Sequence, residues 1–161
     1  MRSLVTKVRV LTLAAALVVT PAVAVAAAPA AEAATAHHTP ARLTALAYAK
    51  HKLGDAYRYG AAGPNAFDCS GLTMRAYGAA KKSIGGHSAT AQYRWASSHH
   101  RLRSRFHAYV GDLLFYGTTS NVYHVAIWAG GNTMIEAPHE GARVRLVPLR
   151  RSGLLSHVAN P

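Results

Sequence analysis

The spacing of apolar side chains divides the chain into a helical part followed by a part made of strands. Apolar residues recur at helical spacing over 40–53 and 69–82, and a third segment over 89–98 follows a capping residue, so three helices are predicted. Thr39 and Ser88 precede two of these segments as capping residues, and Gly54 ends the first. The segment 55–68 is rich in Tyr, Gly, Pro and Asn and is predicted to be a loop.

Four short runs in the second half are β-branched or aromatic and are separated by Gly, Asn or Pro turns: 112–116, 123–129, 133–137 and 142–149. They predict antiparallel strands. Helices followed by strands indicate an α+β fold, with a helical subdomain packed on a small antiparallel sheet. The alternating arginines of 101–105 are expected to form a solvated edge or loop, with a wall-binding patch as the alternative.

The first 36 residues follow a different pattern. Arg2, Lys7 and Arg9 precede an apolar run over 11–19 and a tail of Ala, Val and Pro. This pattern predicts a secretory signal peptide over 1–36 and one domain over 37–161. The strongly apolar run is too short to cross a bilayer comfortably, so we expect cleavage, no stable membrane insertion, and a secreted, cell-wall-associated protein.

Charge narrows the class of partner. Residues 37–161 contain 15 Lys and Arg against 5 Asp and Glu, a net charge of +10 with neutral histidines. Such a charge favours association with polyanions. For an exported chain we expect anionic cell-wall polymers rather than nucleic acid, and the alternative is that the charge only aids solubility.

Cys69 is the single cysteine of the chain. An unpaired cysteine in an exported protein is intermolecular, incidental or a reactive thiol. It lies between a glycine-rich loop and a predicted helix start, where the helix dipole favours the thiolate. The first backbone amides of that helix, those of Cys69 and Ser70, can face a developing oxyanion. The sequence therefore makes Cys69 a candidate nucleophile, although a buried, inert cysteine is the alternative.

A nucleophilic cysteine needs a base and a group that orients the base. Ten histidines follow residue 36, and His124 differs from the others because it opens a predicted strand. Glu136 and His139 are both candidates to orient it. A three-residue loop centred on Gly130 or Gly131 would bring Glu136 opposite or diagonal to His124. A two-residue turn at 131–132 would bring His139 opposite instead, and spacing alone does not choose.

Six segments occur in an order and spacing that is specific as a set: Gly54-Asp55-Ala56-Tyr57-Arg58-Tyr59-Gly60, Phe67-Asp68-Cys69-Ser70-Gly71-Leu72, Ser88-Ala89-Thr90-Ala91-Gln92, Gly111-Asp112-Leu113-Leu114-Phe115-Tyr116, His124-Val125-Ala126-Ile127-Trp128 and Met134-Ile135-Glu136-Ala137-Pro138. With them, the chain resembles the NlpC family of cell-wall endopeptidases, which are papain-like cysteine peptidases. Ala61 and Ala126 stand where that family usually has glycine, which leaves the details of substrate recognition open.

The resemblance implies a role for each matching residue. Cys69 is the nucleophile and His124 the base, and Glu136 takes the third place because that member lies 12 residues beyond the histidine. Tyr57 points its hydroxyl at the oxyanion or substrate, whereas Asp68 and Ser70 contact a free amine or the backbone of the substrate.

The resemblance also implies a substrate, the stem peptides of peptidoglycan, most often cut between D-glutamate and diaminopimelate. It implies no metal and no cofactor. Two other functions stay open, namely an amidase or acyltransferase on the same fold, and a non-enzymatic basic module that binds the wall. The second is disfavoured because binding alone requires neither a cysteine nor a histidine beside a polar partner.

Overall fold

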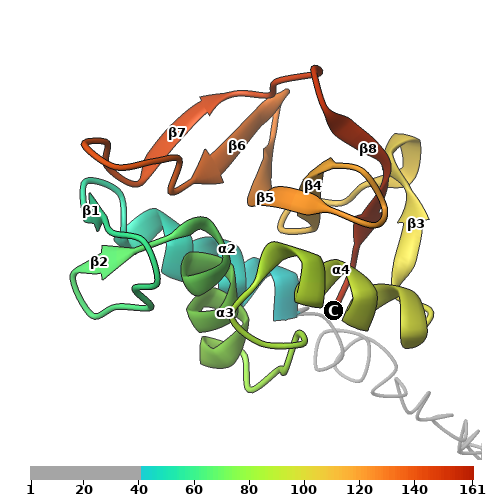
Figure 1. The fold of residues 1–161 in the computed structure, drawn as a ribbon, viewed down its shortest axis with the longest axis horizontal. Coiled ribbons are helices and arrows are strands. Elements are labelled where there is room, and N and C mark those ends of the chain that lie inside the picture. Colours follow the sequence, from blue (N-terminus) through green and yellow to red (C-terminus); the bar gives the residue numbers. More distant parts are fainter. Residues whose placement is uncertain (1–40) are drawn as a thin grey trace, which may run out of the picture.

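The computed structural model describes residues 41–161, in which helices cover one face of an antiparallel sheet (Figure 1). This arrangement confirms the predicted α+β class. The predicted signal peptide over 1–36, the predicted cap Thr39 and residue 40 lie outside the described residues.

The three predicted helices are all present, as α2 (Ala41–His51), α3 (Cys69–Ala79) and α4 (Ala89–Ser98). The side chains of Asp68 and Ser88 cap α3 and α4 by accepting backbone N–H groups three residues further on. α3 ends before the predicted Lys82, because Lys81 adopts a left-handed φ of 56°. Within 41–161 no helix is both long and apolar enough to span a bilayer.

The main sheet has six strands in the order β3-β8-β4-β5-β6-β7. Their bounds are β3 (Leu102–Ser104), β4 (Leu113–Gly117), β5 (Val122–Gly130), β6 (Thr133–Glu136), β7 (Arg145–Pro148) and β8 (Leu154–Ala159). β4 to β7 confirm the four predicted strands, with shifted ends. β3 was predicted only as an edge or loop and forms the edge of the sheet, whereas β8 was not predicted and inserts between β3 and β4.

The segment before Cys69 is more ordered than the predicted loop. β1 (Ala56–Tyr57) and β2 (Ala66–Phe67) pair in parallel within it. The same segment is tied to residues 142–144, because Gly54 N donates to Val144 O at 2.9 Å and Tyr57 N donates to Ala142 O at 2.9 Å. Only the later part of the predicted strand over 142–149 joins the main sheet, as β7. Its first residues, 142–144, instead bind the segment that leads to Cys69.

Apolar side chains fill the space between the helices and the sheet, and a smaller cluster lies on the other face of the sheet. The large buried members of the first cluster are Leu46, Phe67, Leu72, Tyr77, Phe115, Ile127 and Ile135. The second contains Leu114, Tyr116, Ala126, Met134 and Val158. Side chains are thus buried on both faces of the sheet.

The hairpin between β5 and β6 turns on Gly131 and Asn132, whose φ angles of 54° and 60° are typical of a type I′ turn. A bulge between Trp128 and Gly130 then shifts the pairing by one residue.

Beyond this bulge Ile127 pairs with Ile135, so continuing the register makes His124 and Glu136 diagonal neighbours on one face. The hairpin therefore combines the two-residue turn of one predicted alternative with the register of another. The expectation that this turn brings His139 opposite His124 was wrong, because it did not include the bulge.

Candidate active site

Cys69 is the first residue of α3 and is only partly buried. Its side chain therefore lies at the positive end of the helix dipole, close to backbone amides that the helix leaves without an internal partner. Asp68 uses two of these amides, those of Gly71 at 2.7 Å and Leu72 at 2.9 Å. The amides of Cys69 and Ser70 are left as donors for a group bound at the thiol.

Asp68 organises the turn around Cys69. Its Oδ1 accepts from Ser70 Oγ at 3.0 Å and lies 2.9 Å from His87 Nε2, in addition to capping Gly71. Its Oδ2 accepts from Gly60 N at 2.9 Å. Asp68 and Ser70 were predicted to contact substrate, but in the structure both are buried and hydrogen-bonded to one another. Their observed contacts fix the protein's own loop.

A second polar contact holds the first turn of α3 against α4. The Gln92 side chain is fully buried and donates to Ser70 O and Gly86 O, each at 2.9 Å. Its Oε1 accepts from Thr73 Oγ1 at 2.7 Å. The position of the candidate nucleophile is thus set from two sides.

His124 and Glu136 form a buried pair in which His124 Nε2 lies 2.8 Å from Glu136 Oε2. The two residues are 6% and 0% exposed. Burial by itself would lower the pKa of His124, but interactions with the Cys69 thiol and with Glu136 outweigh it and raise that pKa above its usual value. Because Nε2 faces Glu136, Nδ1 is the ring nitrogen left for Cys69.

Two arginines complete the surroundings of Glu136. Arg145 donates to Oε1 from Nε at 3.1 Å and from Nη2 at 2.9 Å, and Arg150 Nη1 lies 2.8 Å from both oxygens. Burial would raise the pKa of this carboxyl, but the hydrogen bonds from His124, Arg150 and Arg145 lower it to about 2. Glu136 is therefore ionised in the folded protein at neutral pH.

Strand register places these groups on one face of the sheet. Tyr116 on β4 pairs directly with His124 on β5, and Glu136 on β6 pairs directly with Arg145 on β7. The ring of Tyr116 lies 5.6 Å from that of His124, and Arg150 lies 5.1 Å above the same tyrosine ring. Four neighbouring strands thus contribute to the environment of one imidazole.

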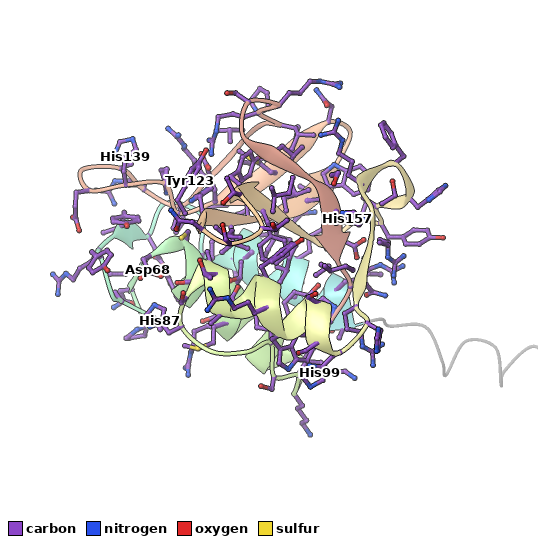
Figure 2. All side chains as sticks on the ribbon, turned by 45° about the vertical axis from the view of Figure 1, so that its right-hand side comes forward. Asp68, His87, His99, Tyr123, His139 and His157 are labelled. Carbon is purple, nitrogen blue, oxygen red and sulfur yellow. The ribbon has the colours of Figure 1, made fainter. Side chains whose placement is uncertain are left out.

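His139, the other candidate to orient His124, has a different environment. It is exposed on the loop after β6, and its Nδ1 lies 2.9 Å from Glu140 O (Figure 2). Of the two candidates, Glu136 is the one in contact with His124.

A cleft of about 260 Å³ opens beside the thiol. Its lining residues are Tyr57, Tyr59, Gly60, Asp68, Cys69, Ser70, His87, Ser88, Ala89, Val122 and Tyr123. Burial raises the pKa of Tyr57, and the proximity of Cys69 and Asp68 raises it further, so this phenol stays protonated at neutral pH. Tyr57 therefore offers a hydrogen-bond donor in the cleft.

Three residues of this region were not singled out from the sequence. Figure 2 shows His87 beside Asp68, below Tyr123, and His87 also lines the cleft. The other two residues are Arg145 and Arg150. Arg145 lies within the predicted strand over 142–149, but only the pairing of β7 with β6 shows that it lies opposite Glu136.

Within residues 41–161 there is no group of three or more His, Cys, Asp or Glu side chains arranged to hold a metal ion. The acidic and basic side chains of the site bind one another instead.

Comparison with known proteins identifies a matching family and named relatives. The NlpC/P60 family model matches residues 54–160. "Probable endopeptidase p60" of Listeria grayi is 39% identical over 111 residues, which is 68% of this chain and 21% of that protein. A "Probable endopeptidase" of Corynebacterium glutamicum (strain R) is 42% identical over 111 residues, 66% of this chain and 49% of that protein. The chain thus aligns with less than half the length of these relatives.

Solved structures show the same fold. The Resuscitation Promoting Factor Interacting protein RipA, mutated at a cysteine, superposes with a TM-score of 0.67 and 25% identity, covering 74% of this chain and 61% of that one. Other RipA structures are mutated at a histidine or a glutamate. RipD of Mycobacterium tuberculosis is described as a non-catalytic NlpC/p60 domain protein adapted to peptidoglycan binding. It superposes with a TM-score of 0.64 and 22% identity, over 76% of this chain and 98% of that one. At this identity the likeness shows the fold alone.

Proposed function

The chain belongs to the NlpC/P60 family, and from this premise we propose that it is a cysteine endopeptidase that hydrolyses stem peptides of peptidoglycan. The relatives at 39% and 42% identity carry the name endopeptidase, which supports the reaction class. The observation that carries the proposal is the buried His124–Glu136 pair beside the Cys69 thiol, at the start of a helix and at the edge of a cleft.

The first half of the proposed reaction forms a thioester. His124 holds the proton of Cys69, and the thiolate attacks the carbonyl carbon of the scissile amide. The negative charge that develops on the carbonyl oxygen is stabilised by the amides of Cys69 and Ser70, with the Tyr57 hydroxyl as a third donor. The C–N bond then breaks, and His124 gives its proton to the leaving amine.

The second half releases the acid. Water enters in place of the amine, His124 takes a proton from it, and the resulting hydroxide attacks the thioester carbonyl. The Cys69 thiolate leaves and the site returns to its starting state. Glu136 stays ionised throughout, keeps the imidazole oriented and stabilises its cationic form.

For the substrate, we propose cleavage between D-glutamate and diaminopimelate, with Asp68 and Ser70 at the end of the cleft that receives a free amine or the peptide backbone. The test is mass spectrometry of the products that the purified protein releases from peptidoglycan fragments. Cys69→Ala and Cys69→Ser should release none while showing an unchanged thermal unfolding curve. Full activity of a folded Cys69→Ala protein would reject the cysteine mechanism.

The same experiment separates the alternatives. An amidase would release an intact stem peptide from the glycan, and an acyltransferase would join fragments. A non-catalytic binding module, the function that RipD's description gives for that protein, would bind fragments and leave their masses unchanged.

We also propose that the protein is secreted, with residues 1–36 as a signal peptide. The proposal is supported by the basic start and the apolar run of the sequence. An N-terminal mass measurement on protein from the culture supernatant should place the first residue between about 27 and 37. An intact Met1 on protein retained in cells would contradict secretion.

A further inference from the structure

The carboxylate of Glu136 is shared between the imidazole and two guanidinium groups. His124 Nε2 and Arg150 Nη1 each lie 2.8 Å from Oε2. On the other oxygen, Arg145 and Arg150 together place three nitrogen atoms within 3.1 Å of Oε1. Glu136 is fully buried, so these groups rather than solvent determine its orientation and its effective charge.

Arg150 is held in place by its own backbone and ring contacts. It lies in the connection between β7 and β8, whose ends are fixed by Leu149 N donating to Asn132 O at 2.9 Å and by Gly117 N donating to Gly153 O at 2.8 Å. Tyr116 Oη donates to Arg150 O at 3.2 Å, and the guanidinium stacks over the same tyrosine ring. The arginine is therefore positioned before any substrate binds.

Arg145 reaches the same carboxylate from the neighbouring strand β7. It lies directly across from Glu136 in the pairing of β6 with β7 and makes a bidentate contact to Oε1. Its side chain is 44% exposed, as is that of Arg150, so each guanidinium also contacts solvent. One buried acid thus faces two half-exposed cations.

The charges of the two arginines affect the protonation of His124. A carboxylate paired with an imidazole alone stabilises the imidazolium with its whole charge. Here two positive groups take part of that charge, and the Arg150 guanidinium lies on the same oxygen as His124. Glu136, Arg145 and Arg150 together carry one excess positive charge, and protonation of His124 adds another. The arginines therefore oppose protonation of His124, and at the same time they hold in place the Glu136 carboxylate that orients the imidazole.

We propose that Arg150, assisted by Arg145, is a positioning residue that holds Glu136 against His124 and sets the upper limit of the pH range in which His124 stays protonated. This inference rests on the proposed function only in treating Cys69 and His124 as the reactive pair. The charged and titratable groups next to the imidazole are Cys69 of α3, Tyr116 of β4 and Glu136 of β6. Around these lie Tyr123 of β5, which acts on Tyr116, and Arg145 of β7 and Arg150 of the β7–β8 connection, which bind Glu136.

The direct test is an NMR titration of the His124 ring in the full chain. Cys69→Ala serves as the parent, because it removes the thiol that contacts His124, and a His124→Gln variant identifies the resonance. Adding Arg150→Gln should raise the titration midpoint of His124 by about 0.3 to 1 pH unit, since a nearby positive charge is lost. Arg150→Lys keeps the charge and should shift the midpoint by less than half as much. Arg151→Gln, at the exposed neighbouring arginine, is the matched control and should leave the midpoint within 0.1 unit.

The sign of the shift shows whether the charge of Arg150 limits protonation of His124. If Arg150 acted only by holding Glu136 in place or by packing the connection, its loss would loosen Glu136 and lower the midpoint or leave it unchanged, and either result in a folded Arg150→Gln protein would overturn the proposal. Should Arg150→Gln fail to fold, Arg145→Gln gives the same test with the same expected direction.

A second readout links the inference to catalysis. With Cys69 restored, the alkaline limb of kcat/KM should move upward in Arg150→Gln by the same amount as the NMR midpoint. Absence of hydrolysis by the unmodified protein would reject the proposed function but leave the NMR result, which needs no substrate, as an independent test of the arginine assignment. An alkaline limb that stays in place while hydrolysis continues would overturn the assignment and leave the proposed function intact.

Discussion

At Glu136 a carboxylate is buried without any exposed surface, a situation that is tolerated only when the charge is paired and hydrogen-bonded. His124, Arg145 and Arg150 provide that pairing. The same contacts that make the burial possible also orient the imidazole. Stability and the proposed chemistry therefore depend on one side chain.

Replacing Glu136 should show how much of the reaction depends on it. Glu136→Gln keeps the shape but removes the charge that stabilises the imidazolium, and we expect a loss of about 10- to 10³-fold in kcat/KM. His139→Ala removes an exposed loop residue that contacts Glu140, and should cost less than about tenfold. Both values are to be measured on one stem-peptide substrate with folding checked by thermal unfolding. A larger loss for His139→Ala would reverse the assignment.

The His124–Glu136 pair should also make stability depend on pH. The pKa of Glu136 is about 2 in the folded protein, so its contribution is complete above the pKa of an unfolded Glu, near 4.3, and is lost as the pH falls toward 2. This contribution is on the order of 3 kcal/mol. The raised pKa of His124 adds stability that is complete below about pH 6.5 and is lost as the pH rises through the folded value.

Urea unfolding measured between pH 2 and 9 tests this dependence. The midpoint should fall steeply below about pH 4.5 in the unmodified protein and less steeply in Glu136→Gln. Equal slopes for the two proteins in the acid range would show that other carboxyl groups control acid unfolding.

Among the secondary-structure elements, α3 depends on a close approach of backbone at Gly71. A Cβ atom on Gly71 would collide with Ala61 O and would lie 2.9 Å from His87 Nε2, because the loop before Cys69 passes directly over the first turn of the helix. The capping side chain of Asp68 bonds the Gly71 amide from the same loop. Only glycine leaves enough room for the loop and the helix to meet.

Gly71 and Gly78 therefore form a matched pair within one helix. Gly71→Ala should destabilise the protein by about 1–3 kcal/mol and should lower kcat/KM, since the Cys69 turn must shift. A Cβ on the exposed Gly78 would meet nothing within 4 Å, so Gly78→Ala should stabilise the protein by about 0.5–1 kcal/mol and leave kcat/KM unchanged. Chemical denaturation and peptide kinetics check both. Equal effects of the two changes would mean that helix propensity, rather than the loop contact, determines the result at Gly71.

For the whole molecule, the distribution of charge separates the site from the rest of the surface. Residues 37–161 have a net charge of +10, yet three of their five acidic residues, Asp68, Glu136 and Glu140, lie at or next to the candidate site. Glu140 accepts the amide of Tyr59, which lines the cleft, at 2.8 Å. The basic surface is thus available for polyanions while the site keeps its own charge balance.

Binding to an anionic cell-wall polymer should follow this distribution. We expect binding of the purified protein to weaken steeply between 0.05 and about 1 M salt, because screening shortens to about 3 Å at the upper end. Cys69→Ala should bind as the unmodified protein does. A sedimentation assay with purified polymer measures both, and binding that is independent of salt would favour specific recognition over the diffuse charge of the surface.

The sequence by itself determined the elements whose signals are local. Asp68 and Ser88 cap their helices through contacts three residues away, so the starts of α3 and α4 could be predicted closely, and with them the place of Cys69. The α+β class followed from the change along the chain from apolar residues at helical spacing to short β-branched and aromatic runs. The resemblance named the family that the comparison found. The expected signal peptide and the roles of Tyr57, Asp68 and Ser70 in substrate binding stay predictions.

Tertiary structure decided what depends on residues far apart in sequence. Hairpin spacing left Glu136 and His139 open, and the contact of Glu136 with His124, which the resemblance implied, depends on a bulge of one residue in β5 that no periodicity marks. β8 inserted between strands that precede it by tens of residues. His87 reached Asp68 across 19 positions and Arg150 reached Glu136 across 14. Local patterns report the backbone preference and amphipathic face of a segment, whereas partners across a sheet are selected by register and packing of the whole chain, and these become defined only when the strands meet.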